Sequence, residues 1–210
     1  MSEPRVSVIV LSHRPDQLPG AIASVLAQTY SNVELIVKHH AGEYYPEKFN
    51  EAWQGASGKW LVFLPDDDRL GPTFVETLVH FLDGYWFTGE GDMAYSDYYS
   101  EKHGYRFQCP FPPNLNTEIL RRYCIPHMTF MVRAEFWRDI GGWDGALAYS
   151  DWDASIRMMQ EGAKILHVPQ FLYLRSVHGG AGSVLMDHEA HATALAQLKA
   201  KHAAFFAGAV

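Results

Sequence analysis

The stretch that decides the fold is WLVFLPDDDRLGP, residues 60–72. Its first five residues are apolar and end at Pro65, which is the length and composition of a strand buried on both faces. Three carboxylates, Asp66, Asp67 and Asp68, follow directly, where the strand is expected to meet solvent. Adjacent anions repel one another, so folding alone gives little reason to place them there. Mg²⁺ or Mn²⁺, which bind oxygen ligands, would remove this repulsion, whereas the alternative is a solvated acidic turn.

The segments before and after this strand alternate between strand and helix patterns. Strands are predicted over residues 6–11, 33–37 and 60–64, and helices over residues 18–26, 49–56 and 73–82. Such alternation is typical of an α/β protein with a mostly parallel central sheet and helices on both faces.

In such sheets ligands bind beyond the carboxyl ends of the strands. Residues 12–14, 38–40 and 66–68 each follow one of the predicted strands. We therefore expect these three segments to converge on one crevice.

The second half of the chain has a less regular pattern. Further strands are predicted over residues 93–99, 127–133, 164–168 and 171–177, a hairpin turn over 102–105, and helices over 116–123, 134–140 and 187–206 and from residue 150 onward. The proline-bearing stretch 109–126 is interpreted as a seam between two halves of one domain.

Composition limits the classes of function. The 210 residues are 48% hydrophobic and carry a formal net charge of -7, which argues against broad binding to nucleic acid or to an anionic membrane. Only two cysteines occur, Cys109 and Cys124, and they are expected to be reduced. No apolar run is long enough to cross a membrane. The expectation is a soluble, cytoplasmic protein, with a homo-oligomer left open.

Short motifs recur along the chain in a characteristic order. They are VSVIVLSHRPD (6–16), SVLAQTY (24–30), NVELIV (32–37), Asn50, GKW (58–60), FLPDDD (63–68), YSD (95–97), GGWD (141–144), SDWD (150–153) and VHGG (177–180). Together they resemble the family 2 glycosyltransferases of the GT-A fold, over nearly the whole chain to about residue 183. Each motif is weak alone, and their joint order carries the resemblance.

The resemblance implies a single GT-A domain, residues 1–210. Residues 1–92 would form the nucleotide-binding half, residues 93–183 the acceptor-binding half with a small additional β element, and residues 184–210 a C-terminal helix. It also implies an inverting transfer from a nucleotide-diphospho-sugar donor, expected to be a UDP-sugar, to a hydroxyl of a glycan or another acceptor, with Mn²⁺ or Mg²⁺ as cofactor.

Site residues follow from the same resemblance. Asp151 occupies the position of the catalytic base, and the neighbouring Ser150 and Asp153 are predicted to cap the helix. The metal ligands are Asp67 first, with Asp66, Asp68 and His178; strand geometry alone would instead pair Asp66 with Asp68. The predicted nucleotide-sugar contacts are Ser12, His13, Arg14, Lys38, His39, Asn50, Lys59, Asp66 and Asp67, and the predicted acceptor contacts are Trp143, Asp144 and Trp152.

One departure from the family pattern concerns the nucleobase. After the second strand the family usually has an acidic residue that binds the base, whereas this chain has Lys38, His39 and His40. Deoxythymidine, guanosine and cytidine donors therefore stay open beside uridine. Two other functions also stay open: a sugar-nucleotide-binding protein without turnover, and a nucleotidyltransferase, although residues 12–15 lack the glycine expected of a nucleotidyltransferase phosphate loop.

Overall fold

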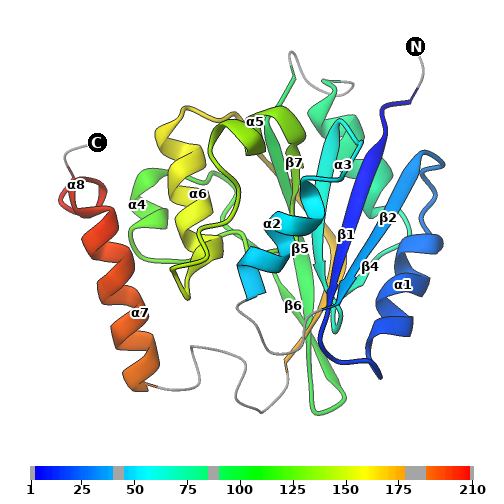
Figure 1. Ribbon diagram of the computed structural model, residues 1–210, viewed down its shortest axis with the longest axis horizontal. Helices are drawn as coiled ribbons and strands as arrows, with labels where there is room; N and C mark the ends of the chain where they lie inside the picture. Colours follow the sequence, from blue (N-terminus) through cyan, green and yellow to red (C-terminus); the bar gives the residue numbers. More distant parts are fainter. Residues whose placement is uncertain (1–2, 40–44, 85–89, 178–187, 209–210) are drawn as a thin grey trace.

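The computed structural model describes residues 3–39, 45–84, 90–177 and 188–208 (Figure 1). Its strands are β1 (Val6–Ser12), β2 (Val33–His39), β3 (Trp60–Pro65), β4 (Arg69–Leu70), β5 (Met93–Lys102), β6 (Tyr105–Cys109), β7 (Met131–Arg133) and β8 (Ile165–Ser176). Its helices are α1 (Leu18–Leu26), α2 (Tyr45–Trp53), α3 (Phe74–Leu82), α4 (Thr117–Leu120), α5 (Ala134–Asp139), α6 (Ser150–Gln160), α7 (His188–Lys201) and α8 (Ala203–Phe206).

The strands form one sheet in the order β2-β1-β3-β7-β5-β8-β4, with β6 paired to β5. Strands β1, β2, β3, β5 and β8 run in one direction, and β4, β6 and β7 run in the other. The expected α/β architecture is confirmed, and the sheet is mixed with a parallel majority. The carboxyl ends of the five parallel strands lie along one edge of the sheet. The acidic residues 66–68 lie at this edge, because they directly follow β3.

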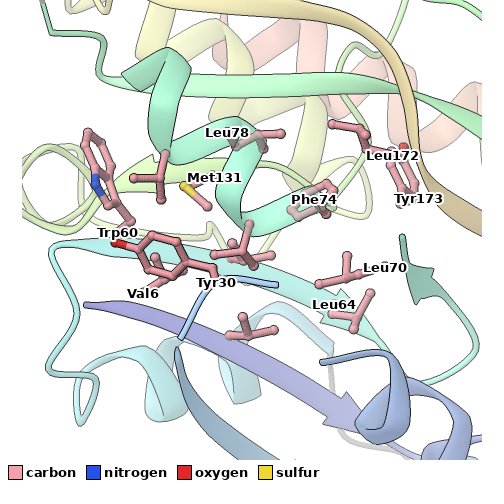
Figure 2. Close-up of a cluster of buried hydrophobic side chains, with 14 of the residues drawn as sticks. Val6, Tyr30, Trp60, Leu64, Leu70, Phe74, Leu78, Met131, Leu172 and Tyr173 are labelled. Carbon is pink, nitrogen blue, oxygen red and sulfur yellow. The ribbon is translucent and has the colours of Figure 1, made fainter. Parts of the chain in front are cut away.

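Side chains of the central strands alternate between two cores. Val62 and Leu64 of β3 face a cluster that includes Ala21 of α1 and Phe74 of α3 (Figure 2). Leu61 and Phe63 face a second cluster built with residues of α2, α5 and α6. Alternate residues of a strand point to opposite faces, so a strand with apolar residues at every position must be covered on both sides. The uninterrupted apolar run of β3 therefore required helices on both faces of the sheet.

A third, smaller cluster joins α4, α6, α7 and α8. It includes Leu120, Trp152, Leu198 and Phe205, all of which are buried. In Figure 1 these helices stand beside the sheet, with α7 in orange and α8 in red outermost. Helix α6 thus contacts the sheet with one face and the C-terminal helices with another.

Several predicted elements differ from the observed ones. The strand predicted over 127–133 is restricted to the three residues of β7. The strands predicted over 164–168 and 171–177 are the single strand β8, whose register against β5 shifts at Ser96, Asp97 and Tyr98, so that Pro169 fits within it. The helix predicted over 187–206 is divided at His202 into α7 and α8. Strand β4 was not predicted, since two residues give no periodicity.

Neither cysteine forms a disulfide in the structure: Cys109 and Cys124 are both free and partly buried. Among the residues that the structure describes, no helix has both the length and the apolar composition needed to span a bilayer.

Candidate active site

Residues 66–68, called here the acidic loop, contact the end of β1 through Asp66. Its Oδ2 accepts hydrogen bonds from the backbone amides of His13 (2.7 Å) and Arg14 (2.6 Å). The Arg14 guanidinium lies 3.5 Å from the other carboxylate oxygen, and Asp66 is only 1% exposed. Both oxygens of Asp66 are therefore occupied by protein donors, which indicates a structural role in shaping the loop and makes Asp66 the least available of the three predicted metal ligands.

Asp67 and Asp68 lie in different surroundings. Asp67 is more accessible and pairs with the Arg14 Nη1 at 2.6 Å. Asp68 is buried, and its Oδ1 accepts the amide of Ser176 at 3.0 Å. Burial, and then the charge of Asp67, raises the pKa of Asp68 to about 8. The protein neighbours of Asp68 therefore do not fully stabilise its ionised form.

The backbone of this loop is held by Arg69. Its Nη1 donates to the carbonyl oxygens of Asp66 (2.9 Å) and Asp68 (2.7 Å), and its Nη2 donates to that of Gln17 (3.0 Å). The guanidinium lies against Gly20 of α1, where a Cβ atom would meet the Arg69 Nε at 2.3 Å. The absence of a side chain at Gly20 therefore leaves the space that the Arg69 guanidinium occupies.

The donor set of the loop fits a hard divalent cation. Its available ligands, Asp67 and Asp68, are carboxylates, and Mg²⁺ and Mn²⁺ need one or two carboxylates when substrate phosphates supply further oxygens. A cation would also offset the charge that raises the pKa of Asp68. The predicted ligand His178 lies outside the described residues.

Asp151 lies in the first turn of α6, close to Cys124 and His127. Its Oδ1 accepts the amide of Trp152 at 2.9 Å, and the Cys124 thiol donates to its carboxylate. Burial raises the pKa of Asp151 above its usual range, although the Cys124 and Trp152 hydrogen bonds and the charge of Arg175 oppose the shift. Single ligand atoms of Cys124, His127 and Asp151 all lie within 4.8 Å of one another.

Arg175 lies near the carboxyl end of β8, and its charge is felt in both acidic regions. Its guanidinium interacts electrostatically with Asp68 of the acidic loop and with Asp151 of α6, and it donates a hydrogen bond to the hydroxyl of Tyr98. The acidic loop and Asp151 are therefore both within electrostatic range of one guanidinium.

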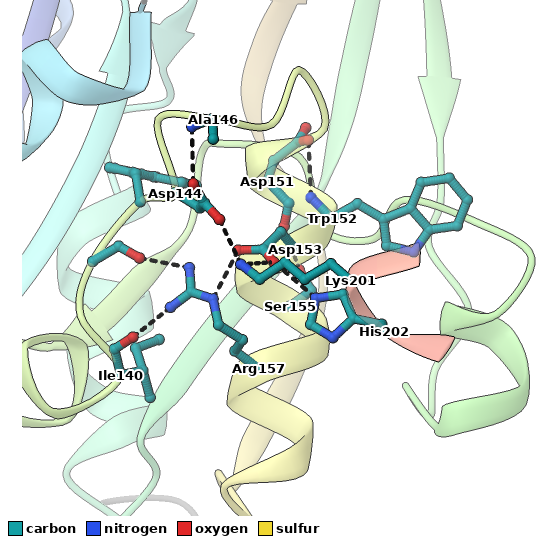
Figure 3. Close-up of polar contacts among 12 residues, drawn as sticks. Ile140, Asp144, Ala146, Asp151, Trp152, Asp153, Ser155, Arg157, Lys201 and His202 are labelled. Carbon is teal, nitrogen blue, oxygen red and sulfur yellow. Dashed lines mark hydrogen bonds and ion pairs between the residues drawn. The ribbon is translucent and has the colours of Figure 1, made fainter. Parts of the chain in front are cut away.

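The predicted cap of helix α6 by Ser150 and Asp153 is wrong, and Asp153 instead binds basic side chains (Figure 3). The N-cap of α6 is Tyr149, and neither Ser150 nor Asp153 caps the helix with its side chain. Asp153 is fully buried and binds the Arg157 Nε (2.7 Å), the Lys201 Nζ (2.6 Å) and the His202 Nε2 (2.8 Å). This group of four residues, called here the Asp153 cluster, joins α6 to the C-terminal helices.

The predicted donor-side residues separate into two groups. Ser12 lies at the end of β1 beside Asp66, and its buried hydroxyl has no hydrogen-bond partner among the described residues. Lys38 and His39 end the neighbouring strand β2; the Lys38 Nζ pairs with Glu51 of α2 at 2.8 Å, and His39 is exposed. Ser12, His13 and Arg14 thus join the acidic loop, whereas Lys38 is engaged elsewhere.

Two predicted donor contacts are structural residues. Lys59 precedes β3, at the opposite end from Asp66, and pairs with Asp83 at 2.9 Å. A strand rises about 3.3 Å per residue, so Lys59 lies roughly 20 Å from Asp66. Asn50 bonds the backbone amide (2.9 Å) and carbonyl (2.7 Å) of Trp143. It therefore joins α2 to the loop that follows α5, whereas Lys59 lies away from the acidic loop.

The predicted acceptor contacts are also engaged within the protein. Trp143 is 2% exposed and packs against Phe63 and Trp137. Trp152 is 6% exposed and donates its Nε1 hydrogen to the Leu120 carbonyl at 2.6 Å. Neither ring is free to stack on a sugar. The Asp144 carboxylate accepts from the Lys201 Nζ at 2.6 Å and from the Ala146 amide at 2.8 Å.

Residues that the sequence did not single out complete the site. Cys124, Arg69 and Ser176 each contact a predicted acidic residue or its backbone. Ser176 and Cys124 lie far along the chain from the carboxylates they contact, so no local spacing could identify them. Only Arg69 could have been identified from the sequence, because it is a basic residue directly after three acidic ones.

A known protein resembles this chain in sequence. No protein-family model matches the chain. The UDP-Glc:alpha-D-GlcNAc-diphosphoundecaprenol beta-1,3-glucosyltransferase WfaP of Escherichia coli is 25% identical over 146 residues, which are 57% of this chain and 56% of that protein.

Two solved structures have a similar fold. TarS 1–349 of S. aureus in complex with UDP-GlcNAc matches with a TM-score of 0.67 and 13% identity, over 85% of this chain and 60% of that one. The mannosyltransferase PcManGT from Pyrobaculum calidifontis, in complex with GDP-Man and Mn²⁺, matches with a TM-score of 0.67 and 14% identity, over 96% of this chain and 64% of that one. The chain therefore spans less than two thirds of the length of these relatives.

These similarities confirm the expected GT-A fold and the expected resemblance to glycosyltransferases.

Proposed function

We propose that this chain is a metal-dependent inverting glycosyltransferase that moves a sugar from a nucleotide-diphosphate sugar to a hydroxyl group. The observation that supports this proposal most directly is the position of Arg175, whose guanidinium interacts with both Asp68 and Asp151. The reaction needs charge neutralisation on the leaving diphosphate and a base for the acceptor hydroxyl, close enough together to act on one sugar carbon. The acidic loop and Asp151 are candidates for these two roles.

On the donor side, Asp67 and Asp68 would hold Mn²⁺ or Mg²⁺, with Asp67 as the principal ligand. The cation would neutralise charge on the leaving diphosphate. Asp66 holds the His13 and Arg14 amides in place, at 2.7 and 2.6 Å, and so fixes the shape of the loop. Ser12, whose buried hydroxyl has no hydrogen-bond partner in the described part of the chain, would contact the donor only after a local rearrangement.

On the acceptor side, Asp151 would remove the proton of the attacking hydroxyl. A base works best when its pKa lies near the working pH, and burial shifts the pKa of Asp151 upward in that direction. The hydrogen bond from the Trp152 amide helps to orient the carboxylate. The sugar would then be displaced in line from the opposite side to its diphosphate, with inversion at the anomeric carbon.

The donor nucleotide is proposed from the relatives. WfaP uses UDP-Glc by its name, and the two similar structures hold UDP-GlcNAc and GDP-Man. Uridine is our first expectation, and guanosine is the first alternative because PcManGT holds GDP-Man. Uridine is not our sole expectation because Lys38 is a hydrogen-bond donor and offers no acceptor for a uracil N–H.

The experiment compares the parent chain with Asp151→Asn. Each protein is mixed with UDP-Glc, UDP-GlcNAc or GDP-Man and Mn²⁺, and the released nucleotide is measured with water or an added glycan as acceptor. We expect Asp151→Asn to reduce turnover by about 10²- to 10⁴-fold, while thermal shift shows unchanged donor binding. Asp139→Asn, at an exposed position on α5, is the matched control and should retain full turnover.

The products distinguish the competing functions. A glycosyltransferase releases a nucleoside diphosphate, whereas a nucleotidyltransferase releases or consumes pyrophosphate. Donor binding without turnover in the parent chain would support a binding protein. Undiminished turnover in Asp151→Asn would show that another group is the base.

A further inference from the structure

We propose that Cys124, His127 and Asp151 form a binding site for Zn²⁺ that is separate from the Mn²⁺ or Mg²⁺ site of the acidic loop. The three residues come from two segments, 124–127 and the first turn of α6, that the fold brings together. In the described part of the chain they are the one group of three or more metal-ligating side chains whose ligand atoms all lie within 4.8 Å of one another.

The geometry suits a small ion after a modest contraction. The ligand atoms lie within 4.8 Å of one another. Zn–S, Zn–N and Zn–O bonds of about 2.0–2.3 Å in a tetrahedron place ligands about 3.5 Å apart. Movements of roughly 1 Å in three side chains would close the site, and three protein ligands would leave a fourth position for water.

The chemistry of the ligands selects the metal. A thiolate, an imidazole and a carboxylate suit Zn²⁺, whereas Mg²⁺ prefers oxygen ligands and keeps much of its water. Mn²⁺ binds such a site more weakly than Zn²⁺ in the usual order of affinities. The two sites would therefore take different ions from the same solution.

Neighbouring groups already hold the ligands in orientation. The His127 Nε2 lies 3.3 Å from the hydroxyl of Tyr98, and the Trp152 amide donates to the Asp151 Oδ1 at 2.9 Å. Hydrogen bonds of this kind to ligating side chains are typical of built metal sites. The Cys124 Sγ lies within 4.8 Å of a carboxylate oxygen of Asp151.

The positive charge of Arg175 nearby is compatible with the ion. Zinc binding would release the Cys124 proton to solvent, so that one thiolate and one carboxylate balance the two charges of Zn²⁺. Arg175 would then face a neutral centre on that side and keep its interaction with Asp68 on the other.

Zinc bound here would block the proposed base. This consequence, unlike the binding itself, rests on the proposed function: a carboxylate that ligates Zn²⁺ cannot accept a proton from an acceptor hydroxyl. Zn²⁺ should therefore inhibit sugar transfer even when Mn²⁺ saturates the acidic loop.

The binding test uses Co²⁺ as a spectroscopic substitute for Zn²⁺, with the full chain and no donor. We expect Co²⁺ to produce a near-ultraviolet thiolate-to-metal absorption that added Zn²⁺ abolishes. Cys124→Ser should remove this absorption and weaken Zn²⁺ binding at least about tenfold by calorimetry. Cys109→Ser, which changes the other free cysteine, is the matched control and should retain both.

A second variant guards against misfolding. If circular dichroism shows that Cys124→Ser is unfolded, His127→Gln is judged by the same two measurements. Absence of the absorption in the parent chain, or its persistence in Cys124→Ser, would overturn the proposal.

A turnover assay then separates the two proposals. Zinc inhibition is measured for each variant relative to its own zinc-free rate, and Cys124→Ser should lose most of the inhibition seen in the parent. If Co²⁺ binds as expected but the zinc-free parent shows no turnover, the zinc site stands and the proposed function fails. If the parent turns over but zinc-bound protein is equally active, binding stands and the block of the base is wrong.

Discussion

Asp68 is a carboxyl group whose burial works against its own ionisation. Burial and the charge of Asp67 raise its pKa from 3.8 to about 8, so the folded chain binds a proton more tightly than the unfolded chain does. The stabilisation from this proton is complete below about pH 4 and is lost as the pH rises toward 8. A divalent cation on the loop would replace the proton as the balancing charge.

Asp68→Asn should therefore stabilise the metal-free protein, and more so at pH 8 than at pH 5. An amide keeps an oxygen for the Ser176 amide but carries no charge. We expect a gain on the order of 1–3 kcal/mol at pH 8, measured by urea unfolding with a chelator present. Asp139→Asn, on the exposed side of α5, should show no such pH dependence. An equal effect at both pH values would contradict the prediction.

Asn50 shows how a motif residue can be structural. Its side chain bonds the backbone amide and carbonyl of Trp143 and accepts from the Trp53 Nε1 at 2.9 Å. Asn50→Ala would leave these largely buried groups unpaired, so we expect the free energy of unfolding to fall by about 1–3 kcal/mol. Gln54→Ala, at an exposed position just after α2, should change it by less than about 0.5 kcal/mol. Donor binding at a temperature where Asn50→Ala remains folded should be unaffected.

Individual residues could be located from the sequence only in part. The carboxylates 66–68 and residues 12–14 were expected to meet because they follow parallel strands, and they do. Trp143 and Trp152 were expected near an acceptor, but a large apolar ring next to a helix or tight loop is usually needed for packing, and both are buried. Nothing local in the sequence distinguishes these two uses.

Helix α1 and the acidic loop are coupled through Gly20. The Arg69 guanidinium occupies the space where a Cβ atom of residue 20 would lie. Gly20→Ala should displace Arg69 from the carbonyl oxygens it holds, and the lost hydrogen bonds should exceed the roughly 1 kcal/mol that alanine gains in a helix. We expect a net destabilisation of about 1–2 kcal/mol in urea unfolding. Gly55→Ala, where the added Cβ meets only one atom at 3.8 Å, is the matched control and should be neutral.

The helices and strands of the first half were predictable because their patterns are strong. An unbroken apolar strand and regularly spaced apolar helix residues determine β1, β3, α1 and α3 almost to their bounds. The second half was less predictable because tertiary contacts set its elements: β7 has only three residues, and β8 continues through Pro169 by a shift of register. A proline is normally taken as the end of a predicted strand. Only the pairing with β5 shows that β8 continues past Pro169.

The Asp153 cluster connects helix α6 to the residues where α7 ends and α8 begins. Asp153 is fully buried with three basic partners, Arg157, Lys201 and His202 (Figure 3). Removal of one member of such a group leaves buried charges unpaired. Asp153→Ala should therefore lower the free energy of unfolding by about 3–5 kcal/mol and increase hydrogen exchange in α7 and α8.

The control for this prediction is Asp144→Ala. Asp144 shares Lys201 with Asp153, but its side chain is 30% exposed, so its loss should cost less than about 1 kcal/mol. Equal effects of the two substitutions would show that burial does not decide the outcome. Unchanged exchange in α7 would show that the apolar contacts of Leu198 and Phe205 suffice to hold the C-terminal helices.

The spacing of Asp151 and Asp153 on one helical turn has an evolutionary consequence. The first residue is the proposed base, and the second anchors Lys201 and His202 from the end of the chain. Substitutions of Lys201 or His202 would disturb Asp153 and, through helix α6, the position of Asp151. Selection for catalysis would therefore act on both residues, although neither touches a substrate. Among homologous sequences, Asp153, Lys201 and His202 are expected to be inherited or replaced as a set, and such covariation would be visible without any knowledge of the reaction.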